Sequence, residues 1–96
     1  MDAYRCIVTK RDTRAYLDKP IEEEKLQKIL LAGRMAGSSK DTQPTRMVVL
    51  RDPQRKKEVA ACGNYAEHLP SAAVGIAVCL PQTGGDFDAG RSAQNM

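Results

Sequence analysis

The fold is decided by residues 36–50, whose sequence is AGSSKDTQPTRMVVL. Residues 37–45 are polar and contain a glycine, two serines and a proline, which predicts a loop. The following Arg46–Leu50 segment contains the continuous apolar run Met47–Leu50 without polar alternation, which is typical of a strand buried on both faces. We therefore expect a polar loop that leads directly into a buried strand.

A helix is expected before this loop, over residues 22–36. Pro20 fits the first turn of a helix, and the three glutamates after it stand where the helix dipole favours negative charge. An apolar stripe at helical spacing follows, made of Leu26, Ile29, Leu30 and Gly33. Closer to the N-terminus, the pattern predicts a short helix over residues 3–10 and an extended connector over 13–17.

Another helix is expected after the strand. Asp52 is a good N-cap and Pro53 suits the first helical position, so this helix begins at residue 53 and continues to about Cys62. The rest of the chain reads as a turn near 65–69, a second buried strand over 73–80, a loop over 81–87 and a helix that begins at Asp88.

Two apolar strands among several helices predict the α+β class. Buried strands need partners on both edges and cover on both faces, and the helices at 22–36 and 53–62 supply only part of that cover. We infer that residues 1–96 form one incomplete domain, truncated in its last helix, or that another chain supplies the missing part.

Composition excludes several classes of protein. The chain has 96 residues, a net charge of +3 and 42% hydrophobic residues, which suits one ordinary domain. No apolar run approaches the roughly 20 residues of a membrane span, and no signal peptide is visible, so we expect no membrane contact and a cytoplasmic location. Cys6, Cys62 and Cys79 are expected to be small buried hydrophobic residues, and His68 a surface or helix-end residue.

The basic residues form two clusters. Arg51, Arg55, Lys56 and Lys57 are interrupted by acidic residues, so we expect them on the solvated face of a helix. The second cluster is residues 10–14, KRDTR, at the end of the first helix. Either it compensates the helix dipole, or it binds an anion, most plausibly a phosphate, with Asp12 orienting an arginine. No nucleophile motif, phosphate loop or metal-ligand pair accompanies it, and Gly84-Gly85 reads as a flexible turn.

The order of several segments resembles the N-terminal half of the FMN-dependent nitroreductase family. These segments are KRDTRAY at 10–16, DKPI at 18–21, AGSSKDTQP at 36–44, the Met-Val-Val-Leu strand at 47–50 and DAGRSAQNM at 88–96. The resemblance covers the whole chain in the correct order and implies a nitroreductase-like sheet flanked by helices. Members of this family are about twice as long, so it also implies that the C-terminal half is missing.

The resemblance assigns the cofactor FMN to two segments. The positions near its phosphate and ribityl chain are Lys10, Arg11, Asp12, Thr13 and Arg14. The positions in the loop that approaches the flavin from the partner subunit are Gly37, Ser38, Ser39, Asp41 and Gln43. Four of this chain's residues depart from the family pattern: Asp12 stands for serine, Gly37 for proline, Asp41 for asparagine and Thr45 for tryptophan.

The function implied by the resemblance is that of a homodimeric oxidoreductase. NADPH or NADH would reduce the flavin, and a nitroaromatic, a quinone or a similar small acceptor would then take the electrons in a ping-pong cycle. We expect residues 1–96 to be inactive alone. Two alternatives stay open: a non-catalytic truncated or split-protein module that pairs with a complementary chain, and a small basic protein that binds a polyanion. The interrupted charge and the 4% aromatic content make nucleic acid an unexpected partner.

Overall fold

The computed structural model describes residues 2–96, except for the side chain of Ser39. Two strands, β1 (Arg46–Leu50) and β2 (Gly75–Cys79), form an antiparallel pair in which Arg46 faces Cys79 and Leu50 faces Gly75. Both predicted strands are confirmed, and β2 is shorter at each end than the expected 73–80. The turn lies just before Gly85, where the Gly84 N–H donates to the Pro81 carbonyl at 3.1 Å, and both glycines have a positive φ that glycine tolerates.

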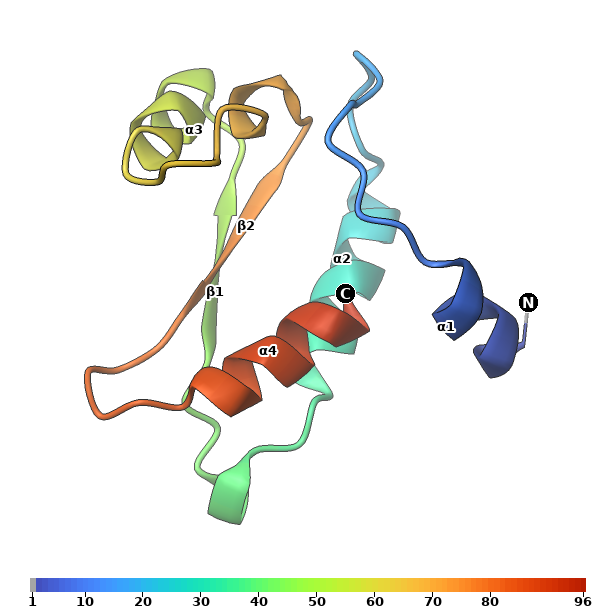
Figure 1. The fold of residues 1–96 in the computed structure, drawn as a ribbon, viewed down its shortest axis with the longest axis vertical. Helices are drawn as coiled ribbons and strands as arrows, with labels where there is room; N and C mark the ends of the chain where they lie inside the picture. The colour runs from blue at the N-terminus through green and yellow to red at the C-terminus, as the bar shows by residue number, and fades with distance from the viewer. Residues whose placement is uncertain (1) are drawn as a thin grey trace.

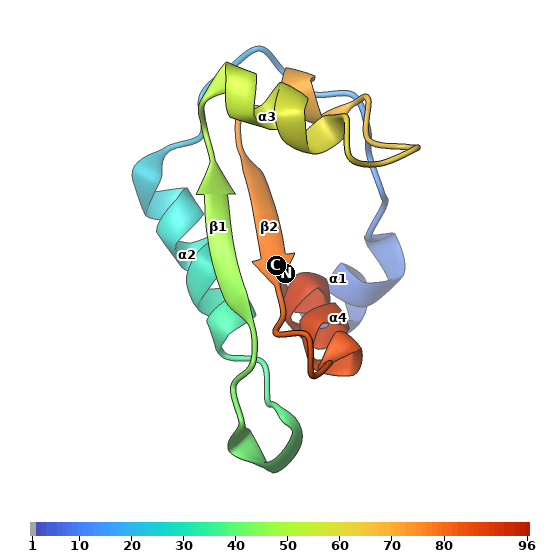
Figure 2. The same cartoon turned by 90° about the vertical axis from the view of Figure 1, so that its left-hand side faces the viewer.

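The helices cover one face and one end of this sheet. Helices α2 (Glu23–Arg34) and α4 (Asp86–Asn95) cross on the same face, and α3 (Pro53–Ala60) lies at one end with the 3-10 helix η2 (Leu69–Ser71) (Figures 1 and 2). A second 3-10 helix, η1 (Ser39–Asp41), projects at the opposite end. Helix α1 (Ala3–Thr9) stands apart from the sheet. The arrangement confirms the α+β class.

Local sequence explains where the helices begin. The Asp52 carboxylate accepts a hydrogen bond from the backbone N–H of Gln54 at 3.3 Å, and Pro53 occupies the first turn of α3 as predicted. Asp2 caps α1 in the same way, accepting from the N–H of Arg5 at 2.8 Å. Helix α4 begins at Asp86 rather than Asp88, directly after the left-handed Gly85. Within the turn expected near 65–69, the helical part is limited to Leu69, where η2 begins.

Helices α2 and α4 are joined at Gly33. The hydroxyl of Ser92, which is 1% exposed, donates to the Gly33 carbonyl at 2.9 Å, and the Asn95 amide donates to the Ala32 carbonyl at 3.3 Å. A Cβ atom added to Gly33 would lie 2.8 Å from the Met96 sulfur and 3.1 Å from that of Met47. The absence of a side chain at Gly33 therefore lets α4 and β1 pack against α2.

An ion pair fixes the other end of α2. Arg51 follows β1 directly, and its guanidinium donates to the Glu23 carboxylate at 2.7 Å. Gln27 donates to the same carboxylate at 2.9 Å. These hydrogen bonds, that of Gln27 first, lower the pKa of Glu23 from its ordinary value of 4.5. The first turn of α2 is thus tied to the end of β1.

The apolar interior is smaller than the sequence predicts. Leu26, at 1% exposed, is the buried hydrophobic residue among those described. The strands are not covered on both faces, and Val48 is 48% exposed. Helix α1 has no buried residue, and its Ile7 is 75% exposed. The predicted burial of the strands is therefore wrong for the chain by itself, because the face of the sheet opposite α2 and α4 carries no layer from residues 2–96 (Figure 2).

The structure also tests the predicted burial of the cysteines and of Lys56, and the predicted position of His68. Cys6, Cys62 and Cys79 are all exposed thiols, so the prediction that they are buried is wrong. Lys56 was expected in solvent but is only 6% exposed, because its ammonium donates to the Ala72 carbonyl at 2.6 Å and ties α3 to the segment before β2. His68 is confirmed as a helix-end residue, at the N-cap of η2, with its ring 6.2 Å from that of Tyr16.

The glycine at the α2–α4 joint provides a test of the packing. Gly33→Val should destabilise the protein by about 1–3 kcal/mol, because its side chain overlaps Met96 and Met47. Gly90→Val is the matched control, since Gly90 is also helical and a Cβ there meets nothing within 4 Å. The measurement is the free energy of urea unfolding, and equal losses for the two variants would contradict the described joint.

The buried lysine provides a second test. Lys56→Met should lower the free energy of unfolding by about 1–2 kcal/mol, since it removes a charged hydrogen bond and leaves the Ala72 carbonyl without that donor. Lys57→Met, at the exposed neighbouring position, should change stability by less than about 0.5 kcal/mol. Urea unfolding measures both. A Lys56 variant as stable as the Lys57 variant would show that the hydrogen bond contributes nothing.

Candidate functional site

The loop between α2 and β1 is a compact turn closed by its own side chains. Ser38 accepts a hydrogen bond at its hydroxyl from the Gln43 N–H at 2.8 Å, and the Asp41 N–H donates to the Ser38 carbonyl at 3.1 Å. The Gln43 side-chain amide donates to the Asp41 carboxylate at 2.9 Å. Four predicted site residues, Gly37, Ser38, Asp41 and Gln43, thus lie in one structural unit. The side chain of Ser39, also predicted, lies outside the described residues.

The backbone of this turn is strained. Lys40, Asp41 and Gln43 have φ values of 55°, 54° and 49°, in the left-handed region that residues other than glycine adopt at a cost. Arg46 braces the end of the loop, because its guanidinium donates to the carbonyls of Gln43 and Thr45, each at 2.9 Å. Strained backbone held by several hydrogen bonds is characteristic of loops that present groups to a ligand.

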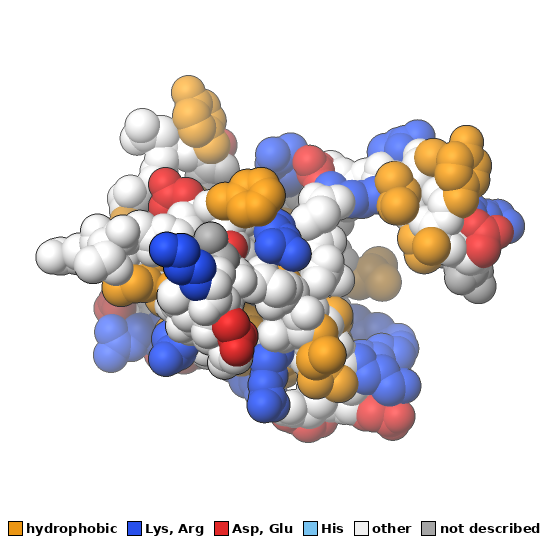
Figure 3. Space-filling model, turned by 90° about the horizontal axis from the view of Figure 1, so that it is seen from below, with side chains coloured by type: hydrophobic (Ala, Val, Ile, Leu, Met, Phe, Trp, Pro, Cys, Tyr) orange, Lys and Arg blue, Asp and Glu red, His pale blue; other side chains and the backbone are white. Residues whose placement is uncertain are grey.

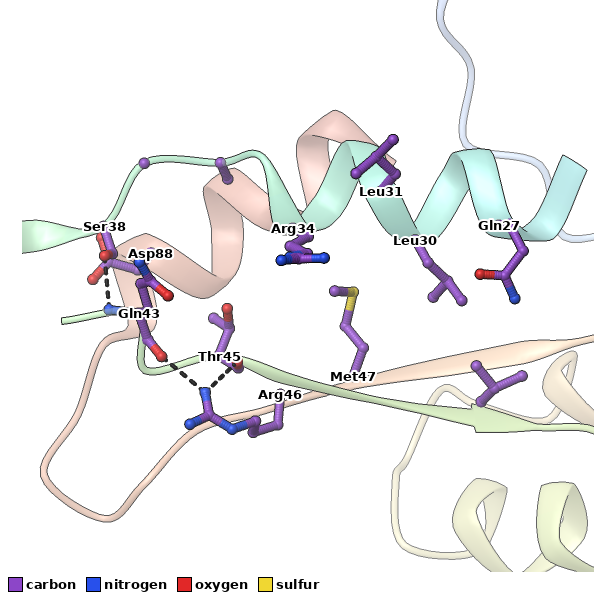
Figure 4. Close-up of a pocket in the computed structure, with 13 residues that line it drawn as sticks. Gln27, Leu30, Leu31, Arg34, Ser38, Gln43, Thr45, Arg46, Met47 and Asp88 are labelled. Carbon is purple, nitrogen blue, oxygen red and sulfur yellow. Dashed lines mark hydrogen bonds between the residues drawn. The ribbon is translucent and has the colours of Figure 1, made fainter. Parts of the chain in front are cut away.

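A cavity of about 620 Å³ lies between this loop, α2 and β1. Leu30 and Leu31 line it from α2, and Met47 and Val49 from β1. Figure 4 shows Arg34 and Met47 facing one another across it, with Ser38, Gln43 and Asp88 together at the loop end. The complete lining is Gln27, Leu30, Leu31, Arg34, Ala36, Gly37, Ser38, Gln43, Thr45, Arg46, Met47, Val49 and Asp88. This combination of apolar walls and a few polar groups suits an organic ligand.

Sequence reasoning missed Arg34 and Asp88 as residues of this cavity. Arg34 follows Leu30 by four residues and therefore shares its helix face, which is a signal the sequence contained. Asp88 was recognised only as a helix start. Asp88 is 7% exposed and lies in the first turn of α4. Its place beside the loop results from the crossing of α2 and α4, which the sequence does not indicate.

The basic segment after α1 divides its charges among different partners. Lys10 donates to the Asp12 carboxylate at 2.6 Å. The Arg11 guanidinium donates to the carbonyls of Lys10 at 2.7 Å and Val8 at 3.4 Å, at the end of α1. Arg14 makes no hydrogen bond or ion pair with any described part of the chain, and Thr13 is exposed beside it.

These contacts give Arg11 and Asp12 different roles in the segment. Arg11 has the helix-end role, because it satisfies carbonyls that the helix leaves without partners. Asp12 pairs with Lys10, so the expectation that it orients an arginine is wrong. The hydrogen bond and the charge of Lys10 lower the pKa of Asp12 below its ordinary 3.8, with a smaller contribution from Arg14. Arg14 is therefore the cation of this segment whose side chain has no hydrogen bond within the described residues and can bind an anion.

The two predicted halves of the site do not meet within one chain. The basic segment lies beside α1, and the loop that contains η1 lies at the far end of α2 (Figures 1 and 2). No set of three or more His, Cys, Asp and Glu side chains within residues 2–96 is arranged to hold a metal ion. No helix in that range is long and apolar enough to cross a lipid bilayer.

Comparison with known proteins identifies a class of NAD(P)H-linked reductases. A protein of Archaeoglobus fulgidus provisionally named NADH dehydrogenase/NAD(P)H nitroreductase is 33% identical over 78 residues, covering 81% of this chain and 45% of that protein. A crystal structure with the same provisional name from Bacteroides thetaiotaomicron superposes with a TM-score of 0.89 at 34% identity, covering 97% of this chain and 57% of that one.

A third similar structure contains a flavin. It is a provisionally assigned nitroreductase from Desulfovibrio desulfuricans in complex with FMN, with a TM-score of 0.84 and 30% identity, matched over 96% of this chain and 58% of that one. The model of the nitroreductase family matches residues 7–83. This chain belongs to the nitroreductase family, which confirms the resemblance and the nitroreductase-like fold. It spans about half the length of the proteins that it matches.

The contact between Lys10 and Asp12 has a pH signature. Lys10→Met should raise the pKa of Asp12 towards 3.8, because it removes the main cause of the lowering. A carboxyl with a lowered pKa contributes stability above 3.8 and loses it as the pH falls through the lowered value, so the variant should lose less stability in that acid range. An NMR titration of the Asp12 carboxyl measures the pKa, with Lys19→Met as control. An unchanged Asp12 pKa in the Lys10 variant would exclude the contact.

Proposed function

We propose that this chain is the FMN-binding N-terminal half of a NAD(P)H-dependent flavin oxidoreductase that acts as a homodimer. The observation that carries the proposal is the pair of features described above. One is an arginine without an internal partner at a family position for the phosphate, and the other is a strained, hydrogen-bonded loop at the family positions for the flavin. The FMN in the Desulfovibrio structure supports the choice of cofactor.

The residues present fit the chemical groups of FMN. A phosphate needs cationic donors. Arg14 offers a planar guanidinium, and the Lys10 ammonium keeps protons that its hydrogen bond to Asp12 does not use. Ser38 and Gln43 supply hydroxyl and amide groups, and the nearby cavity has apolar walls. When bound, the flavin supplies the hydride chemistry, while the protein binds it, orients it and excludes water.

The separation of the two segments supports a homodimer. The basic segment and the loop lie at different ends of one chain, so a single copy cannot offer both to one cofactor. A twofold axis places the same two surfaces of two copies against each other, and the loop of one copy then approaches the basic segment of the other. We expect NADH or NADPH and a small oxidised acceptor to use the same space in turn.

A second candidate function is a module that is not catalytic until a complementary chain completes it. The small apolar interior favours this alternative, since Leu26 is the buried hydrophobic residue of the described chain and Val48 and Ile7 are largely exposed. The polyanion-binding alternative is weaker. Arg51 and Arg55 form ion pairs with Glu23 and Glu58, and Figure 3 shows lysine and arginine side chains scattered among acidic and apolar ones.

Purification under native conditions separates these functions. Absorbance of a bound flavin in the 96-residue chain would support the oxidoreductase directly. Flavin binding only after mixing with the part of the Bacteroides protein that this chain does not cover would support the module that needs completion. Absence of FMN binding in both preparations would refute the proposed function.

The role of Arg14 is testable in the preparation that binds FMN. Arg14→Ala should raise the dissociation constant of FMN about tenfold, which is about 1.4 kcal/mol, because it removes the cation available to the phosphate. Arg55→Ala is the control, since Arg55 pairs with Glu58 on α3 and should leave the affinity unchanged. Fluorescence titration at fixed ionic strength measures both constants. Equal affinity for the Arg14 variant and the unsubstituted protein would refute the phosphate role.

A further inference from the structure

Arg91 of α4 occupies the space over Gly37, the first residue of the candidate flavin loop. A Cβ atom added to Gly37 would lie 3.0 Å from Nη2 of Arg91, 3.6 Å from Cζ and 3.7 Å from Nη1. All three of the nearest atoms belong to this one guanidinium. The position therefore accepts glycine because the cation takes the place of a side chain.

The guanidinium is held from two directions. Its Cζ lies 5.7 Å from the centre of the Phe87 ring, one helical turn earlier on α4, in a cation–π contact. The next residue, Ser92, is buried and donates to the Gly33 carbonyl on α2. Because α4 is joined to α2 immediately beside Arg91, the backbone from which this guanidinium extends is fixed relative to the start of the loop.

Gly37 is the point where the loop leaves the body of the protein. The residue after it, Ser38, accepts the hydrogen bond from Gln43 that closes the turn, so Ser38, Asp41 and Gln43 move as one unit. A contact at Gly37 consequently sets the direction of the entire turn. Among the residues whose side chains the structure describes, none accepts a hydrogen bond from Arg91, so its N–H groups stay available to an anionic group beside Ser38.

We propose that Arg91 is a positioning residue for the bound flavin: it fixes the orientation of the 37–45 loop through Gly37 and supplies a positive charge at the start of that loop. This inference rests on the proposed function. Asp41 places a carboxylate in the same loop, and a carboxylate near the flavin disfavours its reduced, anionic form. A guanidinium at the start of the loop acts in the opposite sense, since charges of opposite sign attract.

The first experiment replaces the cation. Arg91→Met should raise the dissociation constant of FMN about threefold to tenfold and lower the midpoint potential of the bound flavin. Arg91→Lys should restore the potential in part, because the charge returns while the planar contact with Gly37 does not. Fluorescence titration and a dye-equilibration titration measure the two quantities. If Arg91 had a purely structural role, the substitutions would change the affinity for FMN, but the midpoint potentials of the Met and Lys variants would be equal.

The second experiment tests the contact with Gly37. Gly37→Ala should displace the guanidinium and weaken FMN binding by a similar factor, whereas the same substitution in the Arg91→Met background should have no further effect. Gly90→Ala is the matched control, because a Cβ there meets no atom within 4 Å. The same cycle measured by urea unfolding without FMN should also show that the two positions are coupled.

The outcomes separate this inference from the proposed function. If the unsubstituted protein binds FMN and the Arg91→Met variant binds it with equal affinity and equal potential, the inference is overturned and the proposed function stands. Independent effects of Gly37→Ala and Arg91→Met would also overturn it. If no preparation binds FMN, the proposed function fails, and coupling in the unfolding cycle then shows that the contact exists without a flavin role.

Discussion

The hydrogen bond from the Ser92 hydroxyl to the Gly33 carbonyl is the contact on which the candidate site depends. It joins two helices that are distant in sequence, and it does so next to the point where α2 ends and the loop begins. A buried hydroxyl needs a partner, and a helix carbonyl that accepts a second donor provides one. Because Gly33 has no side chain, the helices approach closely enough for that bond to form. The cavity, the loop and the first turn of α4 take their positions from this crossing.

Much of the fold could be predicted from the sequence because its local signals agree. The apolar run Met47–Leu50 after Arg46 predicted β1, and Asp52 with Pro53 predicted the start of α3. The stripe that begins at Leu26 identified α2, and the one buried hydrophobic residue of the described chain is a member of that stripe. In each case the residues that determine the element lie within it or directly beside it.

Features that arise from contacts distant in sequence could not be predicted in this way. Lys56 stands in a solvated-looking cluster, and only its distance from Ala72 in the folded chain explains why it is buried. Asp88 enters the cavity lining because α4 crosses α2, and the exposed Cys79 lies on a strand with no partner on its outer edge among residues 2–96. For the candidate site, the sequence identified the two segments but not the partners of their charges.

Those partners change the electrostatics of the candidate site. The three basic residues of segment 10–14 suggest a strong anion site, yet the Lys10 charge is compensated by Asp12, and Arg11 binds carbonyls at the end of α1. An exposed ion pair adds little stability, so the main effect of Asp12 is to reduce the positive potential offered to a phosphate. In the loop, Asp41 adds a second carboxylate, held by Gln43. Two acidic residues at positions where the family pattern has neutral side chains therefore increase the share of anion binding that falls to the arginines. The side chains of Arg14 and Arg91 form no hydrogen bond or ion pair within the described residues, and that of Arg34, which lines the cavity, forms none either.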